Sequence, residues 1–386
     1  MLINISIFLY LIPSWVVSFM TRREREILRW IEENPMISQQ ELADRAGITR
    51  SSMGVHISNM IKKGYISGKG YILPAASYVA VAGGVNMDVG GISDQPLIPA
   101  DSNPGRVRMS LGGVGRNVAH NMALLGLDAR MITVLGDDIY AQEIMASCAE
   151  LGIDLSMSLH VPGAATSTYL YIADPDGDME LALSDMEIYR HLTPSVLASR
   201  INWLNSAQVL VLDTNIPADS IVWLCEHVEV PIFADPVSVT KAGKLRDVLG
   251  KLNTIKPNRL EAELLSGVSI TDERSLNRAA DVLLETGLHR VFLSLGADGV
   301  LAADHTKRIR LPGRREKIVN TTGSGDAFMA ALVWAYLQGT NLTDSTRAGM
   351  AAAAIAMAGP ETINAEMSVD TLRAKMDSIE QWEEKQ

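Results

Sequence analysis

Cysteine is scarce in this sequence, because Cys148 and Cys225 are the only two among 386 residues. Two cysteines cannot form a disulfide framework, so a reducing, cytoplasmic setting fits the chain best. Neither cysteine lies in a C-x-x-C pair or in a cluster of metal ligands. We therefore expect both to be small buried apolar residues.

Positive charge is also in short supply, since 34 Lys and Arg stand against 45 Asp and Glu, a net charge of −11. The whole chain therefore has no general attraction to nucleic acid or to anionic membranes. The pattern G-x-x-x-x-G-K-[ST] is absent, which excludes P-loop chemistry in its usual form. The composition, 47% hydrophobic and 20% charged, is that of a globular chain long enough for a large core.

Charged residues are missing from residues 1–19, which make up most of an apolar leader at residues 1–20. This stretch is barely long enough to span a membrane and is interrupted by Pro13. A signal peptide needs positive charge before its apolar run, whereas here the arginines begin at Arg22 and would hold the remainder in the cytoplasm. Because Met20 begins a plausible soluble helix, we interpret the leader as upstream sequence translated from a misplaced start. We then expect no membrane contact.

Residues 21–74 predict a small module of three helices followed by a hairpin with a glycine turn at residues 65–73. The boundary signals are Asn34-Pro35 after the first helix, the Ser38–Glu41 capping box and Gly47 around the second, and Thr49 before the third. The expected apolar faces are Ile27, Leu28 and Ile31 in the first helix, and Met53, Ile57, Met60 and Ile61 in the third.

This order of elements resembles a winged helix-turn-helix. The module has nine Lys and Arg against six Asp and Glu, a net +3, whereas the rest of the chain has 25 against 39, a net −14. Such an asymmetry is typical of a DNA-binding module on an acidic body, with the third helix in the major groove of operator DNA. The residues expected near bases are Arg50, Ser51, Ser52 and His56, and those expected at phosphates are Lys62, Lys63 and Lys69. The alternative is a helical module for protein contacts or dimerisation.

After a short junction, residues 77–386 alternate buried-type strands with helical patterns. Alternation of this kind predicts an α/β domain with a mostly parallel sheet flanked by helices. The predicted strands are 78–82, 129–134, 209–212, 232–234, 254–255 and 291–295, and clear helical patterns are 118–125, 141–151 and 276–286. Residues 89–111 and 166–183 are turn-rich and alternating, which suits a small antiparallel β lid.

Ligands of such sheets bind beyond the carboxyl ends of the strands. Polar or glycine residues expected at those ends are Asn86, Asp88, Asp213, Asp235, Asn258, Ser294 and Gly296. Gly112 and Gly113, which open a helix carrying Asn117, allow close approach of the backbone to a ligand. Together with Asn86 and Asp88 they predict a polyol-binding set.

The stretch 319–329 reads as a glycine-rich loop that leads into a helix over residues 327–338. Its backbone N–H groups and the helix dipole predict an anion site, which Gly323 and Gly325 leave open to close approach. A carboxylate at Asp326 beside such a site is explained if it takes a proton from a hydroxyl that attacks a phosphate. The simpler alternative is that Asp326 only caps the helix.

Two further segments also allow two interpretations. Asn258 and Glu261 have the spacing of a simple capping box, and they also suit the placement of Mg²⁺ beside phosphates. Residues 294–300 predict a strand, a tight turn and a strand, either as a plain hairpin or as backbone against a nucleotide.

Taken in order, these segments resemble the ribokinase-like (PfkB) family of sugar and nucleoside kinases over roughly residues 77–365. Its two specific motifs match Gly112, Gly113 and Asn117, and Thr322 to Asp326. Segments 100–105, 235–238 and 256–263 are similar to those of the bacterial pseudouridine kinases of this family. The resemblance implies an ATP-dependent kinase that phosphorylates a ribose 5′-hydroxyl with Mg²⁺ and forms a homodimer through its lid.

The resemblance also implies a role for each matching residue. Asp326 is the base, and Gly323, Ser324 and Gly325 form the anion hole. Asn258 and Glu261 position Mg²⁺ and phosphate, while Ser294, Gly296 and Gly299 line the nucleotide site. The ribose is held by Asn86, Asp88, Gly112, Gly113 and Asn117. The nucleobase is recognised by lid residues among Ser102, Asn103, Thr168 and Tyr169. Ser324 replaces the commoner alanine, and Asn320 lacks the charge that places a monovalent cation in some relatives, which leaves potassium activation open.

Three functions are compatible with these patterns. The first is a kinase of a ribose-containing nucleoside, pseudouridine first, or else of another nucleoside or free ribose. The second is a transcription regulator in which a kinase fold only senses its ligand. The third is an active kinase that also binds operator DNA. The intact Asp326 and Gly323–Gly325 favour catalysis, because a pure sensor has no need of a base.

Overall fold

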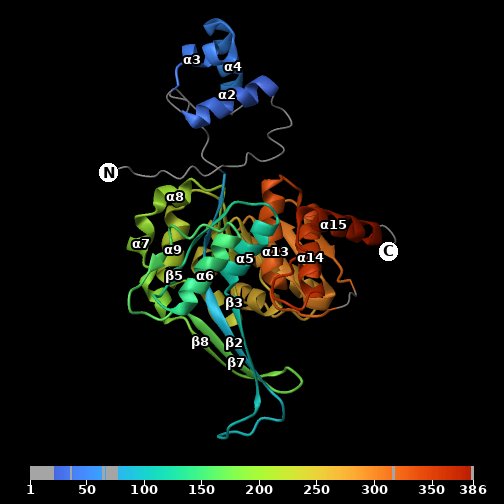
Figure 1. The fold of residues 1–386 in the computed structure, drawn as a ribbon. Coiled ribbons are helices and arrows are strands. Elements are labelled where there is room, and N and C mark those ends of the chain that lie inside the picture. The colour runs from blue at the N-terminus through green and yellow to red at the C-terminus, as the bar shows by residue number, and fades with distance from the viewer. Residues whose placement is uncertain (1–20, 35–36, 63–65, 67–76, 315–317, 384–386) are drawn as a thin grey trace. The chain divides into compact units, whose positions relative to one another are not determined.

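A computed structural model describes residues 21–34, 37–62, 66, 77–314 and 318–383. The chain divides into two compact units, Met1–Ser77 and Tyr78–Gln386 (Figure 1). The leader, the hairpin expected at residues 65–73 apart from Ile66, and the side chains of Lys62, Lys63 and Lys69 lie outside the described part. None of the described helices is long and apolar enough to cross a membrane.

The first unit contains helices α2 (Arg22–Glu33), α3 (Gln39–Ala46) and α4 (Arg50–Lys62). The capping box of α3 is confirmed, since Ser38 Oγ accepts from Glu41 N at 3.2 Å and Glu41 Oε2 accepts from Ser38 N at 2.9 Å. Gly47 ends this helix at a φ of 64°. A second capping box, between Thr21 and Glu24, opens α2.

A small apolar core holds the three helices together. It includes the expected Ile27, Leu28, Ile31, Met53, Ile57 and Met60. The expectation for Ile61 was wrong, because its side chain is 46% exposed. One residue further along a helix rotates a side chain by about 100°, which takes Ile61 off the face that Met60 buries.

The second unit is built on an eight-stranded sheet in the order β14-β13-β12-β11-β10-β9-β1-β4. Six strands are parallel, as expected, and the edge strands β13 and β14 are antiparallel. Their bounds are β1 Val79–Ala82, β4 Ala129–Ile132, β9 Val209–Asp213, β10 Ile232–Asp235, β11 Thr254–Ile255, β12 Arg290–Ser294, β13 Val300–Asp304 and β14 Arg308–Leu311. The short strands β5 (Val134–Leu135) and β6 (Leu159–His160) pair separately.

Helices cover both faces of this sheet (Figure 1). One face packs Ala80, Leu210 and Leu212 against a core that includes residues of α7, α9, α11 and α12. The opposite face packs Val81 and Phe233 against α5, α6 and α13. The helices are α5 Val114–Leu124, α6 Ile139–Glu150, α7 Pro194–Ala198, α8 Ile201–Asn205, α9 Ala218–His227, α10 Val239–Ala242, α11 Arg259–Ser266, α12 Glu273–Glu285, α13 Ser324–Leu337, α14 Leu342–Ala358 and α15 Val369–Glu383, with 3-10 turns η1 Glu187–His191, η2 Gly243–Lys251 and η3 Gly296–Asp298.

Several helices begin earlier than their apolar patterns suggested. Helix α13 begins at Ser324, so Asp326 lies inside its first turn and not before it. Helix α5 begins at Val114, directly after Gly113. In both cases the first helical residues face the ligand end of the sheet, where small and polar side chains interrupt the apolar periodicity on which the prediction depended.

The lid is a separate four-stranded sheet in the order β3-β2-β7-β8. It consists of β2 Asn86–Ser93, β3 Gly105–Gly112, β7 Thr168–Ala173 and β8 Met179–Asp185. The expectation of an all-antiparallel lid was wrong, because β2 and β7 are parallel. Both strands leave the main body in the same direction, and they therefore pair in parallel (Figure 1).

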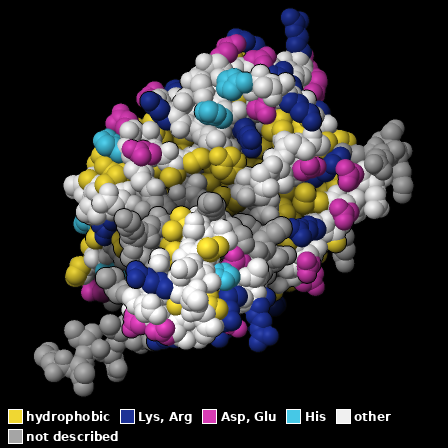
Figure 2. Space-filling model, turned by 90° about the horizontal axis from the view of Figure 1, so that it is seen from above, with side chains coloured by type: hydrophobic (Ala, Val, Ile, Leu, Met, Phe, Trp, Pro, Cys, Tyr) yellow, Lys and Arg dark blue, Asp and Glu magenta, His cyan; other side chains and the backbone are white. Residues whose placement is uncertain are grey.

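Figure 2 shows acidic and basic side chains interspersed across the face in view, with hydrophobic side chains between them.

The helix-opening glycine Gly113 provides a test of the fold. It has a φ of 97°, and an added Cβ would overlap the carbonyl oxygen of Gly84 and lie 2.5 Å from Val85 Cα. We expect Gly113→Ala to destabilise the protein by roughly 3 kcal/mol in urea unfolding. The matched control is Gly126→Ala, at a φ of 76° with nothing within 4 Å of the added Cβ, which should cost about 1 kcal/mol. Equal costs would show that close packing at Gly113 is not what requires glycine.

Candidate active site

The carboxyl ends of four neighbouring strands gather polar side chains, as the sequence predicted. Asp213 ends β9, Asp235 ends β10, Lys256 follows β11, and Ser294 ends β12. Asn258 lies beside Ser294, with which it forms a parallel bridge, and caps α11. Strand β1 lies between β4 and β9, so the direction of strand order reverses there, which is where sheets of this kind bind ligands.

Asn86 and Asp88 lie in the lid strand β2, which begins directly beyond β1. The Asn86 amide donates to Asp88 Oδ1. The Asp88 carboxylate lies over Gly112, where an added Cβ would overlap it. Burial raises the pKa of Asp88 to about 6, although the Asn86 bond and the charge of Arg116 lower it. The expected polyol-binding set is therefore brought together at the root of the lid.

Asp326 is the centre of the site. Its side chain is buried, and its Oδ2 accepts a hydrogen bond from Asn117 Nδ2 at 2.9 Å. The other amide atom, Asn117 Oδ1, is buried and has no hydrogen-bond partner among the described residues. An unsatisfied buried acceptor beside a carboxylate is suited to a ligand hydroxyl, which would donate to it.

Lys256 also lies in the candidate site, although no role was predicted for it. Its ammonium lies 3.3 Å from Asp235 Oδ2, and both side chains are buried. The same ammonium would lie 3.3 Å from a Cβ placed on Gly325, so it sits at the start of α13. A lysine directly after a buried strand is the signal that could have identified it, since lysine is rarely buried unless paired.

Acidic groups outnumber basic ones around this lysine. Burial, with the charges of Asp235 and Asp213, raises the pKa of Asp326 to about 7 against the lowering effects of Asn117 and Lys256. Burial also raises the pKa values of Asp213 and Glu261. Burial alone would lower the pKa of Lys256, but the three acidic neighbours Asp235, Glu261 and Asp326 outweigh it and raise that pKa.

The predicted anion hole falls at the start of α13. Gly323 caps the helix in the left-handed region, with a φ of 79°, and packs against Thr362 so closely that an added Cβ would lie 2.8 Å from Thr362 Cγ2. Ser324 Oγ donates to Thr321 O at 2.8 Å, which turns the hydroxyl back into the loop. The Ser324 backbone N–H donates to the same carbonyl at 3.4 Å. The helix dipole adds partial positive charge at this end of α13.

The Asn258–Glu261 capping box is present in full. Asn258 Oδ1 accepts from Glu261 N and Glu261 Oε2 accepts from Asn258 N, both at 2.9 Å. Within the described ranges, no group of three or more His, Cys, Asp or Glu forms a metal cage. Mg²⁺ fits this arrangement, because it binds through one or two carboxylates, water and substrate phosphates. A further cation would also offset the excess of acidic groups around Lys256.

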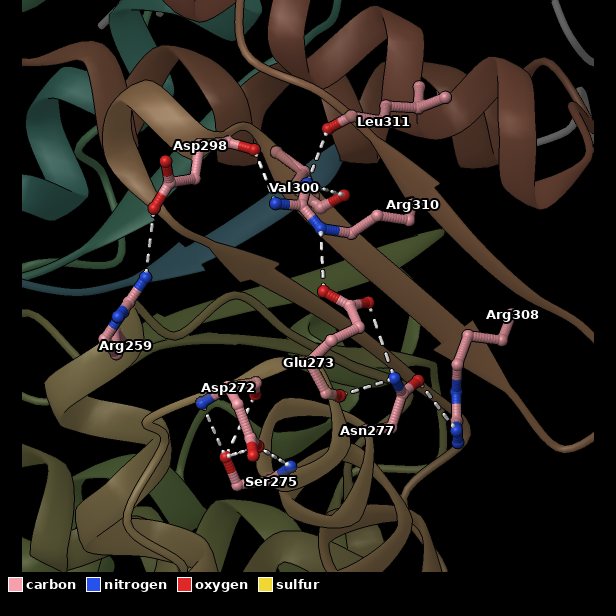
Figure 3. A network of polar contacts seen from close by, with 10 residues as sticks. All are labelled: Arg259, Asp272, Glu273, Ser275, Asn277, Asp298, Val300, Arg308, Arg310 and Leu311. Atoms are coloured by element: carbon pink, nitrogen blue, oxygen red, sulfur yellow. Dashed lines mark hydrogen bonds and ion pairs between the residues drawn. The ribbon is translucent and has the colours of Figure 1, made fainter.

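Two arginines hold Asp298, which lies in the turn from Ser294 to Gly299 (Figure 3). Arg259 donates to Asp298 Oδ2 at 3.2 Å, and Arg310 donates to the carbonyl of Asp298 at 2.6 Å. Arg310 also reaches Glu273, at 3.8 Å. A cavity of about 520 Å³ lies beside this network and not over Asp326. The lack of a side chain at Gly299 is explained by packing against Leu311 and Gly313, whereas Gly296 has open space around it.

Two of the four lid residues expected to read a base do not lie near the site of their own chain. Ser102 and Asn103 are in the loop between β2 and β3, where Asn103 hydrogen-bonds to Ile98 and Asp101. The register instead places Thr168 opposite Met87, and Tyr169 opposite Asp88.

In the first unit, α4 presents one exposed face. Arg50, Ser51 and Ser52 are exposed and His56 is half-buried. The hydroxyls of Ser52 and Thr49 form a hydrogen bond of 2.9 Å. The same exposed face includes three residues that were not predicted to lie on it. They are Val55, which is 60% exposed, and the exposed Ser58 and Asn59. Helical spacing could have identified them, because residues three, four and seven positions after Ser51 or Ser52 lie on the same face of the helix.

Comparison with known proteins identifies the class. Residues 76–368 match the pfkB family of carbohydrate kinases, and residues 20–67 match a winged helix-turn-helix DNA-binding family. The chain therefore belongs to the pfkB carbohydrate kinase family, with an N-terminal winged helix-turn-helix, and is a sugar or nucleoside kinase, a phosphotransferase. Kinases of this family use ATP and typically Mg²⁺.

Two relatives and one solved structure show how far the similarity extends. The chain is 37% identical over 353 residues to the uncharacterized sugar kinase YeiI of Escherichia coli K12, covering 91% of this chain and 98% of that protein. It is 36% identical over 305 residues to pseudouridine kinase of the same organism, covering 78% and 97%. A carbohydrate kinase from Agrobacterium tumefaciens superposes with a TM-score of 0.69 at 28% identity, covering 78% and 97%.

The buried position of Asp326 predicts a pH-dependent stability difference. Because its pKa is about 7 in the folded protein and 3.8 as a free group, the stability contributed by its protonated form is lost as pH rises toward 7. Asp326→Asn stays neutral and should be more stable than the wild type above pH 7 by roughly 2 to 4 kcal/mol, with the gap closing toward pH 4. Urea unfolding at several pH values measures this.

The control for this comparison is Asp176→Asn, in the exposed turn between β7 and β8, which should leave the pH dependence unchanged. A gap between the wild type and Asp326→Asn of the same size at pH 5 and pH 8 would show that Asp326 does not titrate in this range.

Proposed function

We propose that the protein is an ATP-dependent kinase of the 5′-hydroxyl of a ribose-containing nucleoside, with pseudouridine as its substrate. The observation that carries this proposal is the pair of Asn117 and Asp326, a buried carboxylate with a neighbouring amide oxygen left open for a hydroxyl. The similarity to pseudouridine kinase supports the choice of substrate. Another nucleoside or a free sugar is the alternative.

In the proposed reaction, Asp326 takes the proton of the 5′-hydroxyl as the hydroxyl oxygen attacks the γ-phosphorus of ATP. The new O–P bond forms, the bond from the γ-phosphorus to the bridging oxygen breaks, and ADP leaves with that electron pair. A pKa of about 7 suits a base that works near neutral pH, because it combines ionisation with affinity for the proton.

The residues around Asp326 stabilise charge and position the reactants. The N–H groups of Gly323, Ser324 and Gly325 and the ammonium of Lys256 face the transferred phosphoryl group, where negative charge develops. Ser294, Gly296 and Gly299 form the nucleotide turn. Asn258 and Glu261 would hold Mg²⁺, which supplies positive charge to the phosphates when bound. Asn86, Asp88, Gly112, Gly113 and Asn117 would bind the ribose.

Phosphoryl transfer by the full-length protein with ATP and Mg²⁺ tests this proposal. Against pseudouridine, uridine, adenosine, ribose and fructose 6-phosphate, we expect the highest kcat/KM for pseudouridine. Asp326→Asn should lower kcat by about 10²- to 10⁴-fold, because the base is lost while the fold is kept. Asp176→Asn is the control and should retain full activity.

Two results would contradict parts of this proposal separately. Preference for another substrate of the panel would keep the mechanism and overturn the choice of pseudouridine. Near-normal turnover by Asp326→Asn would overturn the role of Asp326. No turnover with any substrate, in a folded wild-type protein, would favour the ligand-sensing regulator.

We also propose that the first unit binds operator DNA, that the protein acts as a homodimer, and that it is located in the cytoplasm. The support for DNA binding is the net charge of +3 over residues 21–74 and the exposed face of α4. In this proposal Arg50, Ser51, Ser52 and His56 contact bases. Lys62, Lys63 and Lys69, whose side chains lie outside the described part, contact phosphates. The support for a dimer is an exposed apolar face on the lid, made of Val107, Met109, Leu170, Ile172, Leu181 and Leu183. The low cysteine content supports the location.

Selection from a library of random DNA duplexes, followed by titration at several salt concentrations, tests this second role. We expect a complex of two chains per duplex whose affinity falls steeply with salt, because phosphate contacts release counterions. Arg50→Ala should weaken binding about tenfold. Arg29→Ala, at an exposed position on α2, is the matched control and should bind normally. Absence of any selected sequence, or equal losses in both variants, would contradict the proposed interface.

A further inference from the structure

The lid sheet has two chemically different faces. Because side chains alternate along each strand, the cross-strand row Met109, Val89, Leu170 and Leu183 lies on one face, and this is the exposed apolar face described above. The other face carries Asp88, with Tyr169 directly opposite it on β7. The ribose-binding carboxylate therefore shares its face with aromatic side chains and not with the aliphatic row.

Tyr169 and Tyr171 form an aromatic pair on this second face. Their ring centroids are 6.1 Å apart with an interplanar angle of 36°, and both side chains are half-buried. The Tyr169 hydroxyl lies 3.4 Å from Met179 Sδ, which directs that ring toward β8. The faces of these two tilted rings offer an aromatic surface, which a free sugar does not need.

The absence of a side chain at Gly90 places the second ring. Gly90 pairs with Tyr171 across the β2–β7 ladder, and a Cβ added to Gly90 would lie 2.8 Å from Tyr171 Cε1 and overlap the end of the ring. The phenol therefore crosses the strand that carries Asp88. Two residues of strand rise put Gly90 about 7 Å beyond Asp88. A group attached to C1 of a ribose held at Asp88 can reach this ring.

We propose that Tyr171, with Tyr169 beside it, forms the stacking surface for the base of the nucleoside, and so selects nucleosides over free sugars. This inference rests on the proposed function, since it requires a ribose at Asp88 with its 5′-hydroxyl at Asp326. Stacking on an aromatic side chain depends on the flat face of a base and not on its hydrogen-bonding edge. Tyr171 therefore sets substrate class, and the choice among bases is left to other residues.

Parallel kinetics on pseudouridine and on free ribose test the inference. In the full-length protein, Tyr171→Leu should raise KM for pseudouridine about tenfold, because an aliphatic side chain cannot stack in the same way. It should change the KM for ribose by less than about twofold, with ribose also tested as a competitive inhibitor where its turnover is slow. Calorimetric binding of pseudouridine without ATP should show the same tenfold loss.

Matched variants separate stacking from a structural role. Tyr171→Phe keeps the ring and should stay within about twofold of the wild type on both substrates. Gly90→Ala keeps both tyrosines but displaces the Tyr171 ring, and it should reproduce the selective loss. Combined with Tyr171→Leu it should add little, because both changes remove the same contact. Tyr140→Leu, on α6, is the control for loss of a tyrosine elsewhere and should have no effect.

The results that would overturn the inference differ from those that would overturn the proposed function. Equal rises in KM for pseudouridine and ribose in Tyr171→Leu would assign Tyr171 a structural role. Unchanged KM values in that variant would remove any role in binding. A wild-type protein that accepts ribose and no nucleoside would overturn the stacking surface together with the proposed substrate, and this would be visible before any variant is made.

Discussion

The charge balance around Lys256 is the constraint on which the ligand end of this molecule depends. One buried ammonium faces the carboxylates of Asp235, Glu261 and Asp326, which come from three different elements, and Asp213 adds a fourth negative group. The cost of burying these charges is only partly offset by the single lysine. An added cation or a proton would therefore relieve the excess negative charge of the candidate site.

The lid and the candidate site are parts of one structure, because the strands β2 and β3 contribute to both. Strand β2 begins with Asn86 and Asp88 in the site and continues outward, and strand β3 returns to Gly112 and the start of α5. Asn86, Asp88 and Gly112 therefore belong both to the lid and to the candidate site.

Much of the fold followed from sequence, because buried parallel strands and capped helices have strong local signals. The strands ending at Asp213 and Asp235 and the capping boxes at Ser38 and Asn258 are of this kind. The parallel pairing of β2 with β7 was missed, because the two strands are about eighty residues apart and local pattern carries no information on their relative direction. Lys256 was missed because its role depends on Asp235 and Gly325, which only tertiary packing brings beside it.

The alternation of faces in β7 has a consequence for how this lid can change over evolution. Leu170 and Ile172 point one way, and Tyr169 and Tyr171 point the other, at every step of a ladder that runs from Met87 to Ile92 on the neighbouring strand. Insertion or deletion of a single residue before Tyr169 would exchange the two sets, placing aliphatic side chains beside Asp88 and tyrosines on the outside. Length changes in this strand are therefore tolerable only in pairs, or when absorbed by a bulge such as the one between Ile172 and Ala173.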